Sequence, residues 1–380
     1  MTFTFRDAAN SAVGVCLLVL GSGCGLFGGD DEGSDEDPVG PSSLVVAIGG
    51  NFADQNGYLM LYNAETGATI RLPDLGAFAH SLTLKDDKAY VSLNTFTTGR
   101  VDVVDLVSGQ IVQQISVASP RSTAFAGDET LLATNLSVFG AEGPEPGIVS
   151  SIVLSTESVE SVAIVGLYPE GIVVKDGRAY VANSGNLGNG TTLSVIDLSS
   201  AEEARVELGC DGPNEVFIEG GNEVVVVCEG KVVYNDDFTE IIEQTNGQVV
   251  FVNPATLQVI DRIVLDLRPG SANGSQSAFY DDISGELYVI SDAADVFLRI
   301  DTDRSVLEAT IDVPDQDDLT GLAAVAYDGL SERLYLARLA KGPGGFGDFT
   351  AAGAVIVLDR RGALVDRFTA GPAPSHIAVR

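Results

Sequence analysis

Two histidines and a few charged residues are the parts of this sequence whose types could do chemistry. His80 and His376 are the only histidines, and two imidazoles beside a carboxylate suit a transition metal. A hydrolase or lyase would need histidine, arginine and glutamate side chains to converge, and Arg121, Glu170 and Glu215 are the charged residues expected near the histidines. A structural role for both histidines is favoured. The sequence therefore predicts no catalytic residue, no metal site and no cofactor.

The cysteines indicate an exported, oxidised protein. Only Cys24, Cys210 and Cys228 lie outside the apolar N-terminal stretch. Cys210 precedes one expected strand and Cys228 ends its hairpin partner, so the two lie nearly opposite each other, and we expect a disulfide. That bond would fix the base of the longest expected loop, residues 229–247. A free catalytic thiol is the weaker alternative, because no histidine lies in that repeat.

Residues 1–23 have the pattern of an export signal. Arg6 stands in a short polar start, residues 12–20 (AVGVCLLVL) are apolar but too short to span a bilayer, and small residues lead up to Cys24. The segment resembles a bacterial lipoprotein signal, in which Cys24 becomes the lipidated N-terminus, although Gly21 stands where such signals usually carry leucine. An ordinary secretory signal is the alternative. Either way we expect export, and lipidation would anchor the protein to the cell envelope, at the outer membrane, facing the periplasm or the cell surface.

Residues 24–43 are rich in glycine, proline and acidic side chains, with six acids between Asp30 and Asp37. Such a segment cannot bury a core, so we expect a disordered tether that anionic lipid headgroups repel. Calcium binding by this run is a less favoured alternative.

The overall charge excludes one class of partner. The formal net charge is −33 and the pI is near 4.1, whereas nucleic-acid-binding surfaces need clustered lysine and arginine. A well-solvated surface is the favoured interpretation, and a calcium-stabilised structural module is an alternative. No phosphate loop, Gly-x-Ser-x-Gly or HExxH motif occurs, and residues 312–318 lack the spacing of an EF-hand.

A repeated pair of strands organises the rest of the chain. Residues 178–183 (RAYVAN) have the composition of a strand, residues 184–191 that of a turn, and residues 193–198 (LSVIDL) that of a second strand. The equivalents of the first strand begin at Leu44, Lys88, Thr130, Asn222, Glu286 and Arg333. Most spacings are in the forties, and two further strands complete each unit. The sequence therefore predicts an all-β, seven-bladed β-propeller of four-stranded antiparallel blades over residues 44–380.

The most complete repeat is YPEGIVVKDGRAYVANSGNLGNGTTLSVIDL at residues 168–198. It resembles the YVTN family of seven-bladed propellers, whose repeat runs Pro-x-Gly, apolar strand, Asp-Gly, YVAN and a VSVID strand. The resemblance covers about residues 44–380 and implies the fold without implying an activity. In this family Pro-x-Gly begins the innermost strand, so residues 374–380 (PSHIAVR) should complete the first blade and close the ring.

Two sets of polar residues recur once per blade. Acidic or amide residues that end the third strand are expected to bond turn N–H groups, which is a structural role: Asn63, Asp105, Asp197, Asn253, Asp301 and Asp359. The second set begins the inner strands and predicts a polar, solvated ring at the mouth of the central channel: His80, Arg121, Glu170, Asn214, Gln276, Thr320 and Ser375. The next residue is small in most blades, with Glu215 and His376 as exceptions.

Length variation is concentrated in loops expected on one face, namely residues 137–147, 184–191, 229–247, 266–275 and 340–352. Variable loops on a rigid frame commonly carry binding, although tolerated insertions would look the same. We therefore expect a monomeric, non-enzymatic surface lipoprotein that binds a protein, glycan or cell-wall component through this loop-rich face. The alternative is a hydrolase or lyase acting at the channel mouth, as the related lactonase-like propellers suggest.

Overall fold

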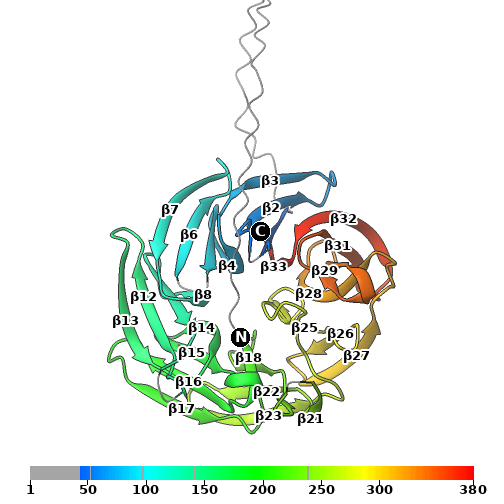
Figure 1. The fold of residues 1–380 in the computed structure, drawn as a ribbon. Helices are drawn as coiled ribbons and strands as arrows, with labels where there is room; N and C mark the ends of the chain where they lie inside the picture. The colour runs from blue at the N-terminus through cyan, green and yellow to red at the C-terminus, as the bar shows by residue number, and fades with distance from the viewer. Residues whose placement is uncertain (1–42, 52, 96–97, 138, 141–142, 238) are drawn as a thin grey trace, which may run out of the picture. The chain divides into compact units, whose positions relative to one another are not determined.

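The computed structural model describes residues 43–380, apart from residues 52, 96–97, 138, 141–142 and 238. Seven four-stranded antiparallel sheets form a ring, which confirms the predicted fold class (Figure 1). The predictions for the signal at residues 1–23, the lipidated Cys24 and the tether at residues 24–43 fall almost entirely outside the described residues, which begin at residue 43. Within the described part, no helix is long and apolar enough to cross a membrane.

The strands of each blade are given from the inner side of the ring outward. Blade 1 contains β33 (Pro374–Val379), β1 (Ser43–Ile48), β2 (Tyr58–Asn63) and β3 (Thr69–Asp74). Blade 2 contains β4 (Phe78–Lys85), β5 (Lys88–Asn94), β6 (Gly99–Asp105) and β7 (Gln110–Ser116). Blade 3 contains β8 (Pro120–Phe125), β9 (Thr130–Asn135), β12 (Ile148–Val153) and β13 (Ser158–Ile164). Blade 4 contains β14 (Pro169–Lys175), β15 (Arg178–Asn183), β16 (Thr192–Asp197) and β17 (Glu203–Glu207).

Blade 5 contains β18 (Pro213–Ile218), β19 (Val224–Cys228), β22 (Gln248–Asn253) and β23 (Gln258–Val264). Blade 6 contains β24 (Ala278–Asp281), β25 (Glu286–Ser291), β26 (Val296–Asp301) and β27 (Val306–Asp312). Blade 7 contains β28 (Leu319–Asp328), β29 (Arg333–Lys341), β31 (Ala352–Asp359) and β32 (Leu364–Pro372). Blade 5 departs slightly from the prediction: Asn222 lies in a turn with φ 75°, so β19 starts two residues later than expected.

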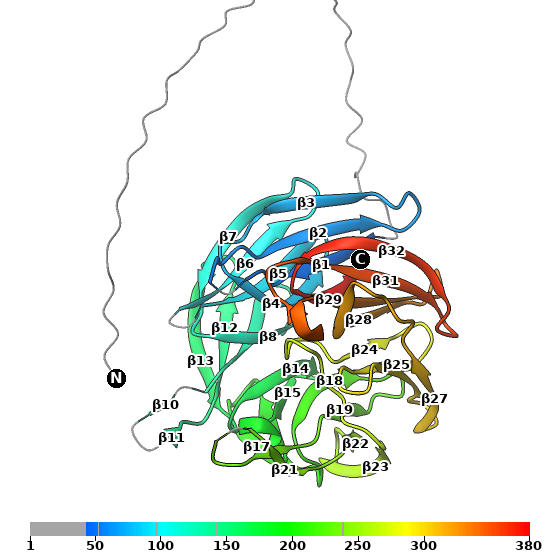
Figure 2. The ribbon, with the colours of Figure 1, turned by 45° about the vertical axis from the view of Figure 1, so that its right-hand side comes forward.

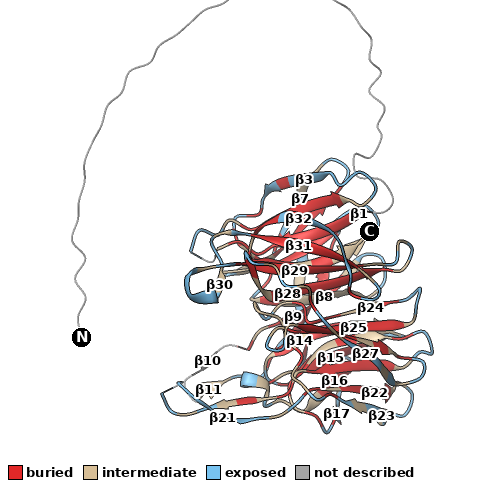
Figure 3. Ribbon diagram, turned by 90° about the vertical axis from the view of Figure 1, so that its right-hand side faces the viewer, coloured by how far each residue is buried: buried red, intermediate tan, exposed pale blue. Residues whose placement is uncertain are grey.

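Short elements occupy the loops between blade strands. One ribbon pairs β10 (Phe139–Gly140) with β11 (Gly143–Pro144), and another pairs β20 (Val232–Tyr234) with β21 (Ile241–Gln244). The remaining elements are β30 (Gly347–Asp348), which pairs with β29, and two 3₁₀ turns, η1 (Asn186–Gly188) and η2 (Pro343–Gly345). Seen from the edge, β10, β11, β21 and β30 project on the same side of the ring (Figure 3). That side is the predicted loop-rich face.

The core lies between neighbouring blades, because each sheet is covered on both sides. The described residues form seven hydrophobic clusters, one for each pair of adjacent blades. All of β19 (VVVVC) is buried, as expected for a strand covered on both faces. The outermost β27 instead alternates exposed and half-buried residues, because one face meets solvent (Figure 3). Each fully buried valine or leucine contributes about 1.5–3 kcal/mol.

The ring closes as predicted, through the C-terminal strand. β33 pairs antiparallel with β1, with Leu44 opposite Val379 and Val46 opposite Ile377. The C-terminus lies in the first blade, near β33 in Figure 1 and near β1 in Figure 2. Ser375 is fully buried and its hydroxyl donates to the carbonyl of Ala79 at 2.6 Å, which ties blade 1 to blade 2. Closure therefore removes two sheet edges that would otherwise expose unpaired backbone groups.

The recurring residues at the ends of the third strands have the expected structural role. The Asp197 carboxylate accepts the N–H groups of Ser199 and Ser200, at 2.9 and 3.2 Å. The same turn bonds occur at Asn63, Asp105, Asn253, Asp301 and Asp359. These hydrogen bonds hold the hairpin turns and leave these residues out of any candidate site.

Candidate functional site

A cavity of about 370 Å³ opens on the loop-rich face, beside the mouth of the central channel. We call it the mouth cavity. Charged and polar side chains on its wall come from the starts of inner strands, from the end of β19 and from the chain between β23 and β24: Arg121, Glu170, Asn214, Glu229 and Arg268. The loops at residues 184–188 and 230–234 supply the rest of the wall, together with Tyr168, Gly212 and Gly274. Three of the seven predicted ring residues therefore line one cavity.

Arg121 and Glu170 form a two-pronged ion pair between blades 3 and 4. Arg121 Nε donates to Glu170 Oε2 at 2.8 Å, and Nη2 donates to Oε1 at 2.9 Å. Arg121 Nη1 lies 3.3 Å from His80 Nδ1. Burial, followed by the charge of Arg121 and by His376, lowers the pKa of His80 well below its usual value, so the imidazole is neutral and Nδ1 accepts from the guanidinium.

The mouth of the channel also contains two carboxyl groups, Glu215 and Glu229, whose pKa is raised. Burial is the main cause that raises the pKa of Glu215 to about 8, and the nearby Glu229 and Glu170 carboxylates add to the rise. Burial also raises the pKa of Glu229, whose Oε1 accepts from Asn214 Nδ2 at 2.6 Å. Glu215 Oε1 accepts the N–H of Ser277 at 3.1 Å. A protonated Glu215 near neutral pH can donate a hydrogen bond or act as a general acid.

The loop at residues 271–275 crosses the channel mouth, which corrects the predicted open, solvated ring. Figure 1 shows this stretch of the chain, between β23 and β24, toward the middle of the ring. Ser275 Oγ lies 3.3 Å from His80 Nδ1, the Gly274 carbonyl accepts from Arg121 at 3.5 Å, and Asn273 Nδ2 donates to the Pro374 carbonyl at 2.9 Å. His80 is consequently only 3% exposed.

The other predicted ring residues do not reach the mouth cavity. Gln276 is 4% exposed and exchanges hydrogen bonds with the backbone of Ile377, so it links blade 6 to the closing strand. Ser375 is buried in the blade contact described above. Thr320 lines a different cavity, between blades 6 and 7. The prediction of one ring is therefore wrong for these three residues. Gln276 and Ser375 bond to backbone groups of neighbouring strands, and Thr320 faces the other cavity.

His376 lies on β33, next to β4, which carries His80. His376 contributes to the lowered pKa of His80, and burial lowers the pKa of His376 itself to about 4. Among the described residues, no group of three or more His, Cys, Asp or Glu side chains is arranged to hold a metal ion. The His80 and His376 pair is therefore neutral and accompanied by Arg121, which repels cations.

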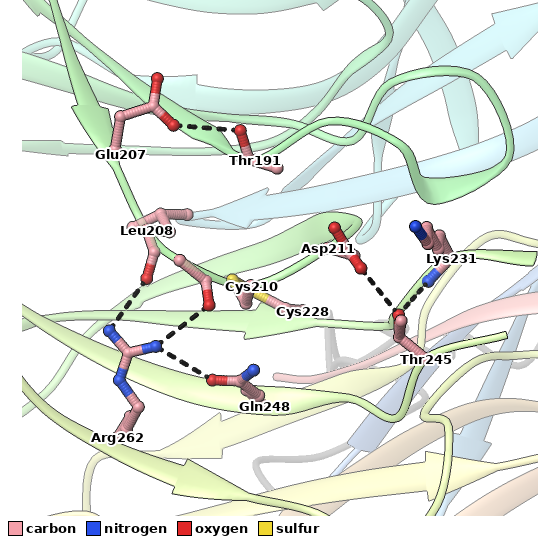
Figure 4. Close-up of a disulfide and its surroundings, with 11 residues drawn as sticks. Thr191, Glu207, Leu208, Cys210, Asp211, Cys228, Lys231, Thr245, Gln248 and Arg262 are labelled. Atoms are coloured by element: carbon pink, nitrogen blue, oxygen red, sulfur yellow. Dashed lines mark hydrogen bonds between the residues drawn. A yellow bond between two sulfur atoms is a disulfide. The ribbon is translucent and has the colours of Figure 1, made fainter.

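Cys210 and Cys228 form a disulfide in the structure, with Cα atoms 6.2 Å apart (Figure 4). Next to it, Thr245 Oγ1 donates to Asp211 Oδ2 at 2.9 Å and accepts the N–H of Lys231 at 2.9 Å (Figure 4). These bonds fix both ends of the loop that carries β20 and β21. Gly212, two residues after Cys210, and Glu229, directly after Cys228, line the mouth cavity, so the disulfide holds part of its wall.

Sequence reasoning missed Glu229, Arg268, Tyr168 and Tyr234 as cavity residues. Glu229 directly follows β19, at a position where the other repeats have no common residue type, so no repeat pattern marks it. Tyr234 lies on β20, inside a segment predicted to be a plain loop. A sequence signal was available for Tyr168, because it directly precedes the Pro-x-Gly motif of blade 4.

The sequence matches no protein-family model and no curated protein. Its structure is similar to hydrazine synthase from Kuenenia stuttgartiensis, with 18% identity, a TM-score of 0.58, and coverage of 78% of this chain and 88% of that chain. It is also similar to a proposed 6-phosphogluconolactonase from Bacteroides fragilis, at 11% identity and TM-score 0.59, over 92% and 100% of the two chains. A protein of unknown function from Desulfotomaculum acetoxidans is similar at 12% identity and TM-score 0.57, over 90% and 99%. At these identities the likeness shows the propeller fold and no activity.

Proposed function

We propose that this chain is an exported binding protein whose mouth cavity holds a neutral, hydroxyl-rich ligand: a glycan, or the sugar part of a cell-wall component. The make-up of the cavity wall carries the proposal. Arg121, Glu170, Asn214 and Glu229 present paired donors and acceptors, and Tyr234 adds an aromatic surface. Concave sites of this size, with a few converging polar groups, are typical of small-ligand binding.

The charges of the cavity favour an uncharged ligand. Arg121 is already matched by Glu170, and Arg268 acts on Glu229, whose pKa burial raises. A ligand phosphate would meet these carboxyl groups, and a ligand cation would meet the two arginines. Sugar hydroxyls both donate and accept, so they suit amide, guanidinium and carboxyl partners at once. The apolar face of a sugar ring can pack on a tyrosine, which has an apolar body and a polar tip.

A glycan array followed by isothermal titration with the best soluble oligosaccharide tests the proposal. We expect saturable binding that Asn214→Ala and Tyr234→Ala each weaken about tenfold, which corresponds to about 1.4 kcal/mol. Leu330→Ala is the matched control, because Leu330 is 84% exposed in the β28–β29 turn, outside the cavity. Absence of any glycan binding, or binding that is the same in both cavity variants, would refute the proposal.

A hydrolase or lyase acting at the channel mouth is the second candidate. Glu215, whose pKa of about 8 keeps it protonated near neutral pH, is the observation that favours it, since such a group can protonate a leaving oxygen. Incubating the protein with bound oligosaccharides and measuring new reducing ends separates the two candidates. Product formation that disappears in Glu215→Gln would support the enzyme, and intact ligand after prolonged incubation would exclude it.

The proposal includes export as a YVTN-type lipoprotein anchored through Cys24. The apolar stretch at residues 12–20 and the small residues before Cys24 support it. Metabolic labelling with a radioactive fatty acid tests it, with Cys24→Ser as the control. Label that persists in Cys24→Ser, or a wild-type protein without label that is released into the soluble fraction, would refute lipidation.

A further inference from the structure

A second cavity, of about 430 Å³, lies on the same face between blades 6 and 7. Its walls come from the β25–β26 turn, the start of β28, the end of β29 and the loop around β30, and none of its residues is shared with the mouth cavity. The residues that matter for its chemistry are Asp292, Asp295, Arg338, Phe346 and Phe349. Nothing in the proposed glycan binding uses this cavity.

Arg338 is a buried cation whose hydrogen-bonding capacity is mostly unused. Its side chain, on β29, is 4% exposed, and Nη2 donates to Asp295 Oδ1 at 2.8 Å. Within the part of the chain that the structure describes, Nε and Nη1 have no hydrogen-bond partner. A guanidinium is always charged and has five N–H donors, so buried donors without acceptors are costly. A ligand carboxylate at this wall would supply an acceptor once the buried Nε or Nη1 turns toward the cavity.

A ligand that carries only negative charge does not match this cavity, because the carboxyl group of Asp292 also lines it. One oxygen of Asp292 accepts the N–H of Leu322 at 2.8 Å. Burial raises the pKa of Asp292, and the nearby Asp295 adds to the rise while Arg338 opposes it. A ligand that brings an ammonium group close to Asp292 would favour its ionised form. Arg338 and Asp292 together therefore present groups of opposite charge on one cavity wall.

The rim of the cavity is aromatic. Phe346 is 79% exposed and Phe349 is 42% exposed, both on the loop that contains η2 and β30. Asp348 fixes this loop, because its Oδ1 accepts the N–H groups of Thr350 and Ala351 at 2.8 and 3.2 Å. A fixed loop that holds two phenylalanines in solvent offers an apolar surface to a ligand side chain.

We infer that the second cavity binds a free α-amino acid with a large apolar side chain. Its carboxylate would bond to Arg338, its ammonium to Asp292, and its side chain would pack on Phe346 and Phe349. Carboxylate and ammonium groups on one carbon match the two charges that line the same wall.

Isothermal titration of the full mature chain tests this inference, with the twenty common amino acids and two analogues of L-phenylalanine as probes. Hydrocinnamate lacks the ammonium group and phenethylamine lacks the carboxylate. We expect saturable binding of L-phenylalanine or another large apolar amino acid, at least about tenfold tighter than either analogue. Binding to none of the twenty, or equally tight binding of an analogue, would overturn the inference.

Two variants locate the site without risking the fold. Asp292→Asn keeps the oxygen that accepts from Leu322, and Phe346 is largely exposed, so Phe346→Ala disturbs little packing. Each should weaken amino-acid binding at least about tenfold, leave glycan binding unchanged and leave the melting temperature no lower. Leu330→Ala is again the control. Amino-acid binding that survives both variants would overturn the inference whatever the outcome at the mouth cavity.

Discussion

Replacing Glu215 with glutamine should make the protein more stable at neutral pH. Glu215 lies at the start of β18 and is partly exposed to the channel mouth. Its Oε1 accepts the N–H of Ser277, and a glutamine can keep that bond. Burial is the main reason that its pKa rises from 4.5 to about 8. The folded protein therefore holds a proton that the unfolded chain releases between these two pH values.

The sign and size of the stability change follow from this difference in pKa between the folded and unfolded states. Below pH 4.5 the carboxyl is protonated in both states and has no effect on stability. From pH 4.5 to about 8 only the unfolded state ionises, so the free energy of unfolding falls by about 1.4 kcal/mol per pH unit, or about 3 kcal/mol at pH 7. Above pH 8 both states are ionised and the loss is complete. Water reaches the side chain from the channel and reduces the effect, so we expect the carboxyl group to lower the free energy of unfolding by about 2 kcal/mol at pH 7.

Urea unfolding between pH 5 and 9 measures this effect. The chain has ten tyrosines and no tryptophan, so tyrosine fluorescence and circular dichroism follow the transition. The net charge of −33 adds its own pH dependence, and Glu65→Gln, at an exposed turn position, controls for the loss of one charge. The stability gain of Glu215→Gln over Glu65→Gln should grow from pH 5 to pH 8 and then stay constant. A gain that does not change with pH would refute the reasoning.

Three further perturbations test the structure itself. The double variant Cys210→Ser, Cys228→Ser removes a disulfide between residues 18 positions apart, so calorimetry should find a free energy of unfolding about 3 kcal/mol lower. A change below about 1 kcal/mol would contradict the loop-entropy argument. Arg121→Gln leaves the mostly buried Glu170 without its cation, so urea unfolding at pH 7 should show that the free energy of unfolding falls by about 2 kcal/mol. Titration should also show weakened glycan binding. An unchanged urea midpoint would contradict this prediction. Deleting residues 374–380 exposes the edge of β1, so size-exclusion chromatography should show association and thermal melts should lose their sharp transition. A monomeric variant that still unfolds in one sharp transition would argue against closure by β33.

The fold could be predicted because its signals are local and repeated seven times. The apolar strand at residues 178–183 and its equivalents are recognisable one by one, and counting them shows that the first blade lacks an inner strand. Pairing of β33 with β1 follows from that count although the two strands lie at opposite ends of the chain. The repeats thus supply long-range information that a single strand would not contain.

The site could be predicted only in part because its geometry depends on contacts without a local signal. Position in the repeat grouped Arg121, Glu170 and Asn214, and these three residues line the mouth cavity. The bond distance of 3.3 Å between His80 and Ser275 joins residues 195 positions apart, and no repeat pattern predicts that one loop of seven turns inward. Another long-range contact, with the backbone of Ile377, accompanies the burial of Gln276, so a polar residue type at an inner-strand start does not by itself indicate exposure.

The seven blades also provide a comparison within the molecule that bears on function. The residue equivalent to Glu215 is small in five other blades: Ser81, Ser122, Gly171, Ser277 and Gly321. A small residue is therefore sufficient for packing at this position, whereas we expect Glu215 to lower stability at neutral pH by the amount argued above. A carboxyl group that the fold does not need and that costs stability is best explained by contact with a ligand or a reacting group. Glu215 is also electrostatically coupled to Glu229 and Glu170, which line the mouth cavity. If Glu215→Gln stabilises the protein and weakens glycan binding together, the stability cost and the ligand contact belong to the same side chain.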